Sequence, residues 1–262
     1  MPWTRASELS RAVACPASTH LPRVPDSPGD GAAWGTLVHA WKETGRWPVD
    51  DLRTRRRAAA LVAAGLTRGD LWPGGEHEVT YAVSTAARGA MVARETLDTP
   101  EQRNAFAAAR GPEWVTGTAD WVGDWFGEPW IDDLKTGVSH PIDFAAHRAG
   151  DLADDGGDPW DLWQLRFYAL GEIVWRNREA PSGVWVSVTW WPRYPADSAP
   201  VRIGPRRVAA AEVLGTIGPL LEMARRNAAE SAAGPAVARA GDHCTFCRSR
   251  AYCPVYTGDN NT

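Results

Sequence analysis

The residues with the clearest chemical potential are the carboxylates and the lysine of "IDDLKTG" (131–137). Strand alternation puts Asp133 and Lys135 on one face and Asp132 on the other. Asp120 ends a Gly-x-x-Asp run on the preceding predicted strand, and if the two strands pair, it meets Asp133 at the sheet edge. Asp132 competes with Asp133 for any metal role, and alternation alone favours Asp133.

Paired carboxylates at such a position would hold a hard divalent cation, Mg²⁺ or Mn²⁺. The cation could polarise a scissile phosphate and lower the pKa of a bound water. Lys135 would orient that water, help to deprotonate it, or stabilise charge that develops on the phosphate. The alternative is a solvated strand face with a weak Asp133–Lys135 ion pair.

Two predicted helices carry further candidates. Gly35, His39 and Glu43 fall at i, i+4 and i+8, close to one helix face. The His39 imidazole could complete a carboxylate metal site, with Glu43 orienting its surroundings or Lys42; a surface histidine is the alternative. Gln164 and Tyr168 are i, i+4 neighbours that could hydrogen-bond a phosphate backbone, although such residues are common on helices.

The four cysteines are placed unevenly. Cys244, Cys247 and Cys253 lie within ten residues, and Cys15 lies near the other end. In a reducing compartment such clusters are metal ligands more often than disulfides. Four thiolates suit structural Zn²⁺, and a histidine, His243 or His20, could replace one of them.

The overall composition limits the classes of protein. The net charge of −4 gives no global attraction to nucleic acid. The sequence lacks an apolar run long enough to span a membrane and a convincing secretion signal, so we expect a cytoplasmic protein without membrane contact. Of the 28 basic residues only Lys42 and Lys135 are lysines, which marks positions where a compact point charge is needed.

The patterns predict one α/β domain over 1–262, with a helical insertion at about 46–72. The predicted turn between the paired strands lies near Gly127, and a helix ends at Gly45. The expected helices are 7–15, 35–45, 51–66, 160–177 and, kinked at Pro219, 206–233; the expected strands are 75–83, 113–125, 129–137 and 182–192.

Four motifs occur in a familiar order: "GTLVHAWKE" (35–43), "GTAD" (117–120), "IDDLKTG" (131–137) and "QLRFYALG" (164–171). This order of Gly-x-x-x-His, Gly-x-x-Asp, Asp-x-Lys-Thr-Gly and Gln-x-x-x-Tyr resembles the RecB-like branch of the PD-(D/E)xK nuclease superfamily. The resemblance extends from about residue 10 to 255. It implies a restriction-endonuclease-like core, a mixed central β-sheet flanked by helices.

The resemblance also implies residue roles. The metal ligands would be His39, Asp120, Asp133 and the backbone carbonyl of Leu134, and Lys135 would be the catalytic lysine. Supporting or DNA-binding roles would fall to Gln164 and Tyr168, with Glu78 at most peripheral.

The cysteine spacing resembles the iron–sulfur staple of AddB-type and CRISPR-associated nucleases of this branch. The resemblance implies that Cys15 and the 244–253 segment ligate one [4Fe–4S] cluster that joins the N- and C-terminal regions. Structural Zn²⁺ stays open as the alternative.

The resemblance predicts a metal-dependent deoxyribonuclease, an exonuclease on DNA ends or single strands. The expected setting is recombination, repair, phage DNA processing or CRISPR adaptation, alone or with a separate helicase or recombination protein, since the chain has no phosphate-loop motif. The alternatives are a catalytically idle DNA-binding module and a zinc-stapled scaffold protein. A strand-guiding groove could be lined by Arg53, Arg55, Arg56, Arg57, Arg206, Arg207, Arg225, Arg226, Arg248 and Arg250.

Overall fold

The computed structural model describes residues 4–22, 24, 30–84, 91–110, 114–137, 158, 160, 162–176, 181–193, 198–233, 237–241, 244, 247 and 249–256. The strands are β1 (Thr4–Arg5), β2 (Glu76–Ser84), β3 (Met91–Thr96), β4 (Trp114–Trp125), β5 (Glu128–Gly137), β6 (Gly183–Pro192) and β7 (Val201–Ala209). The α-helices are α1 (Leu9–Ala14), α2 (Asp30–Thr44), α3 (Leu52–Ala63), α4 (Arg68–Leu71), α5 (Pro100–Ala108), α7 (Trp163–Trp175) and α8 (Ala210–Ala233). Short 3₁₀ turns are η1 (Ala6–Glu8), η2 (Pro16–Thr19) and η5 (Arg250–Tyr252).

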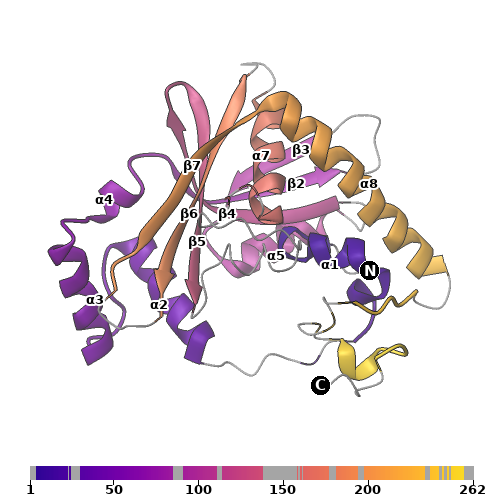
Figure 1. Cartoon of the computed structure of the whole chain (residues 1–262), viewed down its shortest axis with the longest axis horizontal. Coiled ribbons are helices and arrows are strands. Elements are labelled where there is room, and N and C mark those ends of the chain that lie inside the picture. Colours follow the sequence, from indigo (N-terminus) through magenta and orange to yellow (C-terminus); the bar gives the residue numbers. More distant parts are fainter. Residues whose placement is uncertain are drawn as a thin grey trace.

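Within the described part of the chain, seven strands form one mixed sheet in the order β3-β2-β4-β5-β6-β7, with β1 beside β4. β5 and β6 run parallel, as do β1 and β4, and the remaining neighbours are antiparallel. Helices flank this sheet (Figure 1). The predicted mixed sheet with flanking helices is therefore confirmed, while the single-domain boundaries stay a prediction.

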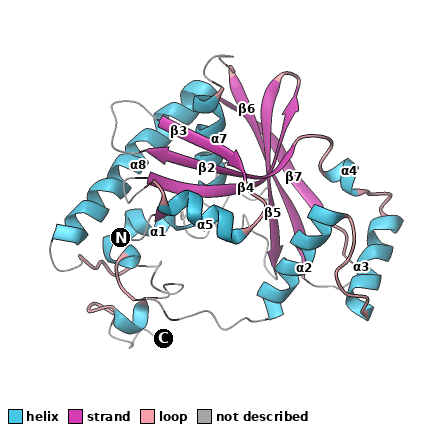
Figure 2. Ribbon diagram, turned by 180° about the vertical axis from the view of Figure 1, so that it is seen from behind, coloured by secondary structure: helices cyan, strands magenta, loops and turns pink. Residues whose placement is uncertain are grey.

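The two central strands separate halfway along their length. β4 and β5 pair from Trp125↔Glu128 to Trp121↔Asp132. Beyond that point β4 continues along β2, whereas β5 continues along β6 as far as Gly137. Figure 2 shows β2, β3 and β4 running across β5, β6 and β7. We call the gap between Asp120 on β4 and Asp133 on β5 the fork; it lies in the middle of the sheet, so the expected position at a sheet edge is wrong.

Each face of the sheet has its own apolar core. On one face α7 and α8 pack over a core that includes Val79, Val122 and Ile131. On the other face α2, α3 and α4 cover a tryptophan-rich core that contains Trp34, Trp41, Trp72, Trp121, Trp130 and Trp191. Alternation along β5 divides its side chains between the two cores, so consecutive residues of this strand have different surroundings.

Local sequence signals explain most element boundaries. Asp51 and Thr99 cap α3 and α5 with capping boxes. Gly45 follows α2 with a φ of +70°, a conformation that ends helices easily at glycine. In the β4–β5 hairpin, Phe126 and Gly127 have φ values of +53° and +79°, as a tight two-residue turn requires.

Three expectations about elements need correction. The helix expected over 51–66 ends at Ala63, and Thr67 caps a separate short helix, α4. Residues 206–209 belong to β7, which pairs with β6, rather than to the following helix. β3 and α5 were not expected at all. Pro219 lies inside α8, and the kink there stays a prediction.

The segments near the two ends of the chain lie together (Figure 1). The amide of Ala17 donates to the carbonyl of Val237 at 3.2 Å, and the Ser249 hydroxyl donates to the carbonyl of Leu21 at 3.3 Å. None of the helices described has the length and apolar character that crossing a membrane demands.

Candidate metal centre

The fork brings together the acidic and basic residues of two motifs. Because β5 has left β4 at this point, the Leu134 amide has no ladder partner on β4 and instead donates to Asp120 Oδ2 at 2.7 Å. On the neighbouring residue of β5, Asp133 Oδ2 lies 2.5 Å from Lys135 Nζ. Asp120, Asp133 and Lys135 therefore gather where the strands part, on the face opposite Asp132.

Asp132 has a structural environment. Its Oδ2 accepts a hydrogen bond from Trp72 Nε1 at 2.7 Å, and its Oδ1 accepts one from Ser187 Oγ at 2.5 Å. The side chain is fully buried on the tryptophan-rich face. The alternation argument thus separated the two aspartates as the structure does.

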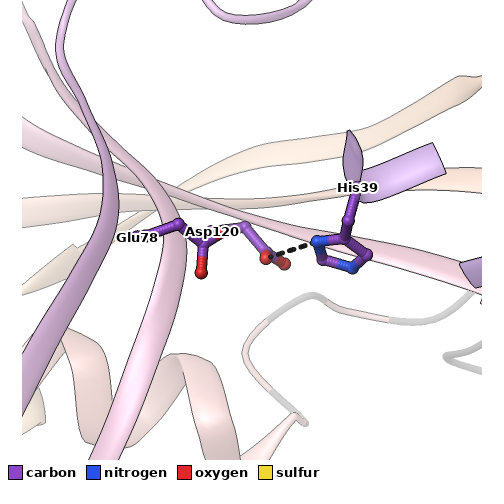
Figure 3. A group of neighbouring side chains, drawn as sticks. All are labelled: His39, Glu78 and Asp120. Carbon is purple, nitrogen blue, oxygen red and sulfur yellow. Dashed lines mark ion pairs between the residues drawn. The ribbon is translucent and has the colours of Figure 1, made fainter. Parts of the chain in front are cut away.

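A third element, α2, delivers His39 to the fork. His39 Nδ1 lies 3.4 Å from Asp120 Oδ1, and Figure 3 shows the imidazole pointing at this carboxylate. Gly35, one turn earlier, lets α2 approach β5, because a Cβ there would lie only 3.1 Å from Thr136 Oγ1. Among the described residues, one cluster contains three potential metal ligands whose donor atoms all lie within 4.8 Å of one another: His39, Glu78 and Asp120.

Glu78 is more central than the sequence indicated. It is buried on β2 with a φ of +56°, and the β2–β4 register, His77↔Trp121 and Val79↔Ala119, places it across from Asp120. A positive φ is uncommon for a glutamate and often accompanies a functional constraint. We expected Glu78 to be peripheral, but it lies beside Asp120 and His39, so that expectation is wrong about its position. No motif pointed to it, because its strand conformation is irregular at this residue.

Two cations that the motifs did not assign surround Glu78. Lys42 Nζ is fully buried, 3.3 Å from Glu78 Oε1, and it also donates to the backbone carbonyl of Asp120. Arg103 of α5 contacts Glu78 Oε2. The signal for Lys42 was present in the composition, since the chain's two lysines both lie at the fork.

The surroundings of the fork shift the pKa values of its carboxyl groups in different directions. Burial raises the pKa of Asp133 to about 6 despite the Lys135 ammonium, and the Asp120 charge adds to this effect. Burial alone would raise the pKa of Asp120 too, but Lys42, His39, Lys135 and the Leu134 amide together hold it below its usual value. Burial also raises the pKa of Glu78 against the opposing effect of Lys42. Of the three carboxyl groups, only Asp120 has its pKa lowered, so its charge persists to the lowest pH.

Lys135 is held by the Gln-x-x-x-Tyr helix. Its Nζ donates to Gln164 Oε1 at 2.8 Å, and its side chain keeps 28% exposure, so it can reach a substrate. Burial would lower the pKa of Lys135, but Asp133 and Asp120 raise it overall, which keeps the ammonium charged. Tyr168 is buried beneath, and its pKa is raised well above the usual value by burial and by the nearby carboxylates.

Gly117 allows Tyr168 of α7 to pack closely against β4. A Cβ there would lie 2.6 Å from the Ala6 Cβ and 3.0 Å from Tyr168 Cε1. The first residue of the Gly-x-x-Asp motif therefore lets η1 and α7 approach β4. Any larger residue would push α7, and with it Gln164, away from the fork.

A pocket of about 350 Å³ lies next to the fork. Gln164 and Arg103 belong both to its lining and to the contacts of the fork. None of the described residues that line it is acidic, although the chain carries net negative charge. The lining consists of Arg5, Ala6, Ser7, Thr80, Pro100, Arg103, Asn104, Ala107, Thr116, Gly117, Thr118, Gln164 and Tyr168.

The predicted arginine groove is not supported at its centre. Arg57 is fully buried and donates to the carbonyls of Ser198 and Arg193 at 2.7 and 2.6 Å, so its expected role in DNA contact is wrong. Arg55 and Arg56 are exposed, and Arg55 pairs with Asp50 at 2.6 Å. Their contact with DNA stays a prediction.

Other predicted positions are distributed as follows. Glu43 is exposed at the end of α2 and lies outside the group of close metal-binding atoms, so its supporting role stays a prediction. Arg206, Arg207 and Arg225 each pair with a nearby carboxylate. Arg248 and His243 fall outside the described residues.

The cysteines lie where the two ends of the chain meet. Cys15 is buried, and its Sγ accepts a hydrogen bond from the Arg239 amide at 3.5 Å. The Sγ of Cys244 lies 4.0 Å from the carbonyl of the same Arg239. Among the described cysteines no three sulfur atoms lie within 4.8 Å of one another.

Comparisons with known proteins complete the description of the site. A candidate exonuclease from Eubacterium rectale is 13% identical, with a TM-score of 0.49 over 94% of this chain and 88% of the other. A phage-related exonuclease from Haemophilus somnus 129PT is 11% identical, with a TM-score of 0.34 over 88% of this chain and 96% of the other. A search of curated proteins finds no match. The sequence profile of the PD-(D/E)XK nuclease superfamily matches residues 6–254, so this chain belongs to that superfamily of nucleases.

Proposed function

We propose that the protein is a divalent-cation-dependent DNA nuclease, an exonuclease that acts on DNA ends or single strands and belongs to the RecB-like branch of its superfamily. The observation that carries the proposal is the meeting of Asp120, Asp133 and Lys135 at the fork, with Lys135 Nζ 2.5 Å from Asp133 Oδ2. A binding module without activity would not need an ammonium directed at a buried carboxylate beside an accessible pocket.

The donors of the fork fit Mg²⁺ or Mn²⁺. Both ions prefer carboxylate and carbonyl oxygens, and Asp120 and Asp133 supply the first kind. The N–H and C=O of one strand residue point to the same side, as in a hydrogen-bonded pair. The Leu134 carbonyl is therefore directed, like its amide, into the fork. His39 completes this set from α2.

The roles of the side chains follow from their contacts. A divalent ion, when bound, supplies polarisation of the scissile phosphate and a lowered pKa for water. His39, Asp120, Asp133 and the Leu134 carbonyl would hold it. Lys135, fixed by Gln164, keeps its proton and stabilises negative charge as it develops on the phosphate, or orients the attacking water.

The pocket beside the fork supports the choice of substrate. Arg5 and Arg103 offer guanidinium groups for phosphates, and Ser7, Asn104 and Thr118 offer neutral hydrogen-bonding groups for sugar and phosphate oxygens. We propose that the strand enters through this pocket, in place of the groove that Arg57 would have formed.

We also propose that the four cysteines ligate a [4Fe–4S] cluster. Cys15 and Cys244 both contact the backbone of Arg239, which supports a common site at the meeting point of the chain ends. In a zinc site all sulfurs bind one ion at about 2.3 Å and so lie ~3.8 Å apart. In a [4Fe–4S] cluster each cysteine binds a different iron, and the order and spacing of the cysteines, which resemble those of iron–sulfur nucleases, favour the cluster over zinc.

A nuclease assay tests the central proposal. The protein, purified without oxygen, is incubated with end-labelled single- and double-stranded DNA and Mn²⁺ or Mg²⁺, beside Lys135→Ala. Cleavage that requires the ion and is lost in the variant supports the enzyme. Absence of cleavage by a protein that still binds DNA would favour an idle binding module.

Iron, sulfide and zinc analysis of the same preparation tests the cluster. We expect iron and sulfide, both lost in Cys15→Ser. Stoichiometric zinc without iron would overturn the cluster and favour the zinc-stapled alternative.

A further inference from the structure

Lys42 is buried at the centre of the fork's acidic group. Its side chain is fully excluded from solvent, and its Nζ lies 3.3 Å from Glu78 Oε1 and 3.6 Å from Asp120 Oδ1. The ammonium also donates to the backbone carbonyl of Asp120, and the Trp72 ring lies 5.9 Å away. Oxygens from two carboxylates and one carbonyl therefore surround a single positive charge.

These oxygens are the kind that a divalent ion would use. Both oxygens of Glu78 already face a cation, Oε1 Lys42 and Oε2 Arg103, so a metal ion would have to share them with these side chains. Asp120 instead faces cationic groups through Oδ1 alone, which lies near His39 and Lys42, while its Oδ2 accepts from the neutral Leu134 amide. Glu78 thus serves the buried lysine, while Asp120 is shared between the lysine and the metal side of the fork.

We propose that the Lys42 ammonium takes the place of a second metal ion, so that this nuclease centre binds one divalent cation where a two-metal site would bind two. The inference rests on the proposed function, because it presupposes the ion held by His39, Asp120 and Asp133. Its physical basis is the repulsion between like charges a few ångströms apart in a buried site.

The second lysine of the chain has a different situation. Lys135 contacts Asp133 and Gln164 and keeps part of its side chain exposed. It can respond to a substrate, whereas Lys42 is enclosed and can only fix Glu78 and Asp120. Lys42 is accordingly a positioning residue, and a lysine suits it because an ammonium is more compact than a guanidinium.

The test counts Mn²⁺ ions bound to the full chain by calorimetry and by the paramagnetic resonance of unbound Mn²⁺, without DNA. We expect one Mn²⁺ per chain for the unaltered protein. For Lys42→Met we expect two ions per chain, because the oxygens around the lysine are freed and the repelling charge is gone. Lys135→Met is the matched control, since it removes the other ammonium of the fork and should still bind one ion.

Glu78→Gln decides the matter if Lys42→Met does not fold. Because Glu78 is occupied by Lys42 and Arg103, we expect its substitution to change Mn²⁺ affinity by less than about threefold, while Asp120→Asn abolishes binding. Two ions in the unaltered protein, no change in Lys42→Met, or a loss in Glu78→Gln as large as in Asp120→Asn would each overturn the inference. No Mn²⁺ binding by the unaltered protein would instead overturn the proposed function.

Discussion

Asp132 and Asp133 are consecutive residues of β5, and comparing them separates a structural environment from that of the proposed metal site. Both are buried, and burial raises the pKa of each. Asp132 accepts hydrogen bonds from the neutral donors Trp72 and Ser187, one at each oxygen, and its Oδ1 also lies 3.8 Å from Arg202 Nε. Asp133 instead faces the Lys135 ammonium beside a break in the sheet. Asp133 therefore lacks the fixed neutral donors that hold Asp132, which is what its proposed role as a metal ligand requires.

The two faces of the sheet differ in the same way. On the tryptophan-rich face, polar groups such as Asp132 and Arg57 are fixed by indole, hydroxyl or carbonyl partners. At the fork, charged groups balance one another, and a bound ion could rearrange them. The following predictions test this difference, in order of expected effect.

The largest effect should come from exchanging the two aspartates for asparagine. We expect Asp133→Asn to lower the rate of DNA cleavage at least ~100-fold, because losing a direct metal ligand should exceed the effect of losing an outer partner. Asp132→Asn should keep activity within a few-fold per folded molecule but lose about 1–3 kcal/mol of stability, since its amide group cannot accept from both donors. Single-turnover rates and urea unfolding measure the two effects. Equal loss of activity in both variants would contradict the division of roles.

Arg57 should behave as a structural residue despite its charge. We expect Arg57→Met to lower the free energy of unfolding by about 2–3 kcal/mol, because two carbonyls lose a charged donor in the core. Arg55→Met, at the exposed neighbour, should change it by less than about 0.5 kcal/mol. Salt-dependent DNA binding, measured on both variants, should be unchanged for Arg57→Met. A reduced salt slope for that variant, with normal folding, would restore the arginine groove.

The raised pKa of Asp133 should appear in the stability of the metal-free protein. The folded-state value of about 6 exceeds the unfolded value of 3.8, so this group favours folding below pH 3.8 and loses that contribution as pH rises through about 6. We therefore expect Asp133→Asn to be more stable than the unaltered protein at pH 8, by on the order of 2 kcal/mol, and to converge with it near pH 4. Denaturation at several pH values, with chelator, measures the difference. A difference in the free energy of unfolding that does not change with pH would contradict the raised pKa of Asp133.

His77, next to Glu78 on β2, should make the stability of the protein sensitive to acid. Burial, Lys42 and Arg68 lower the pKa of His77 to about 4, so its neutral form stabilises the fold above pH 6.5 and this contribution is lost as pH falls toward 4. We expect His77→Gln to remove about 1 kcal/mol of acid sensitivity in that range, the value being reduced for partial solvent screening. Melting temperatures at pH 7 and pH 5 would show it. Identical acid sensitivity in both proteins would count against a half-buried histidine that is neutral in the folded state.

Much of the fork could be predicted from the sequence because the relevant rules are local. Alternation separated Asp132 from Asp133, and helical spacing placed His39. Glu78 could not be found this way, because its positive φ interrupts the strand and its importance comes from Asp120 on another strand. Lys42 was visible only as a compositional exception.

The incorrect predictions of secondary structure also arise from contacts between segments that are distant in the sequence. Residues 206–209 contain arginine and alanine, which favour helices, but pairing with β6 overrides that preference. β3 has few strongly apolar residues, and its partner β2 makes it a strand. The fork lies where β4 and β5 stop pairing, and the sequence of neither strand alone determines that position.

The contact between the first and last parts of the chain has a consequence for biosynthesis. The Asn227 amide donates to the carbonyl of Ala12, across 215 residues. At roughly 5–20 residues per second, a ribosome needs about 10–40 s to make the chain between them. During that interval α1 lacks α8, its packing partner, and Cys15 emerges long before Cys244. Closure of the N-terminal segment onto the core must therefore wait until α8 has been made, and any joint use of the four cysteines until residues 244–253 have followed.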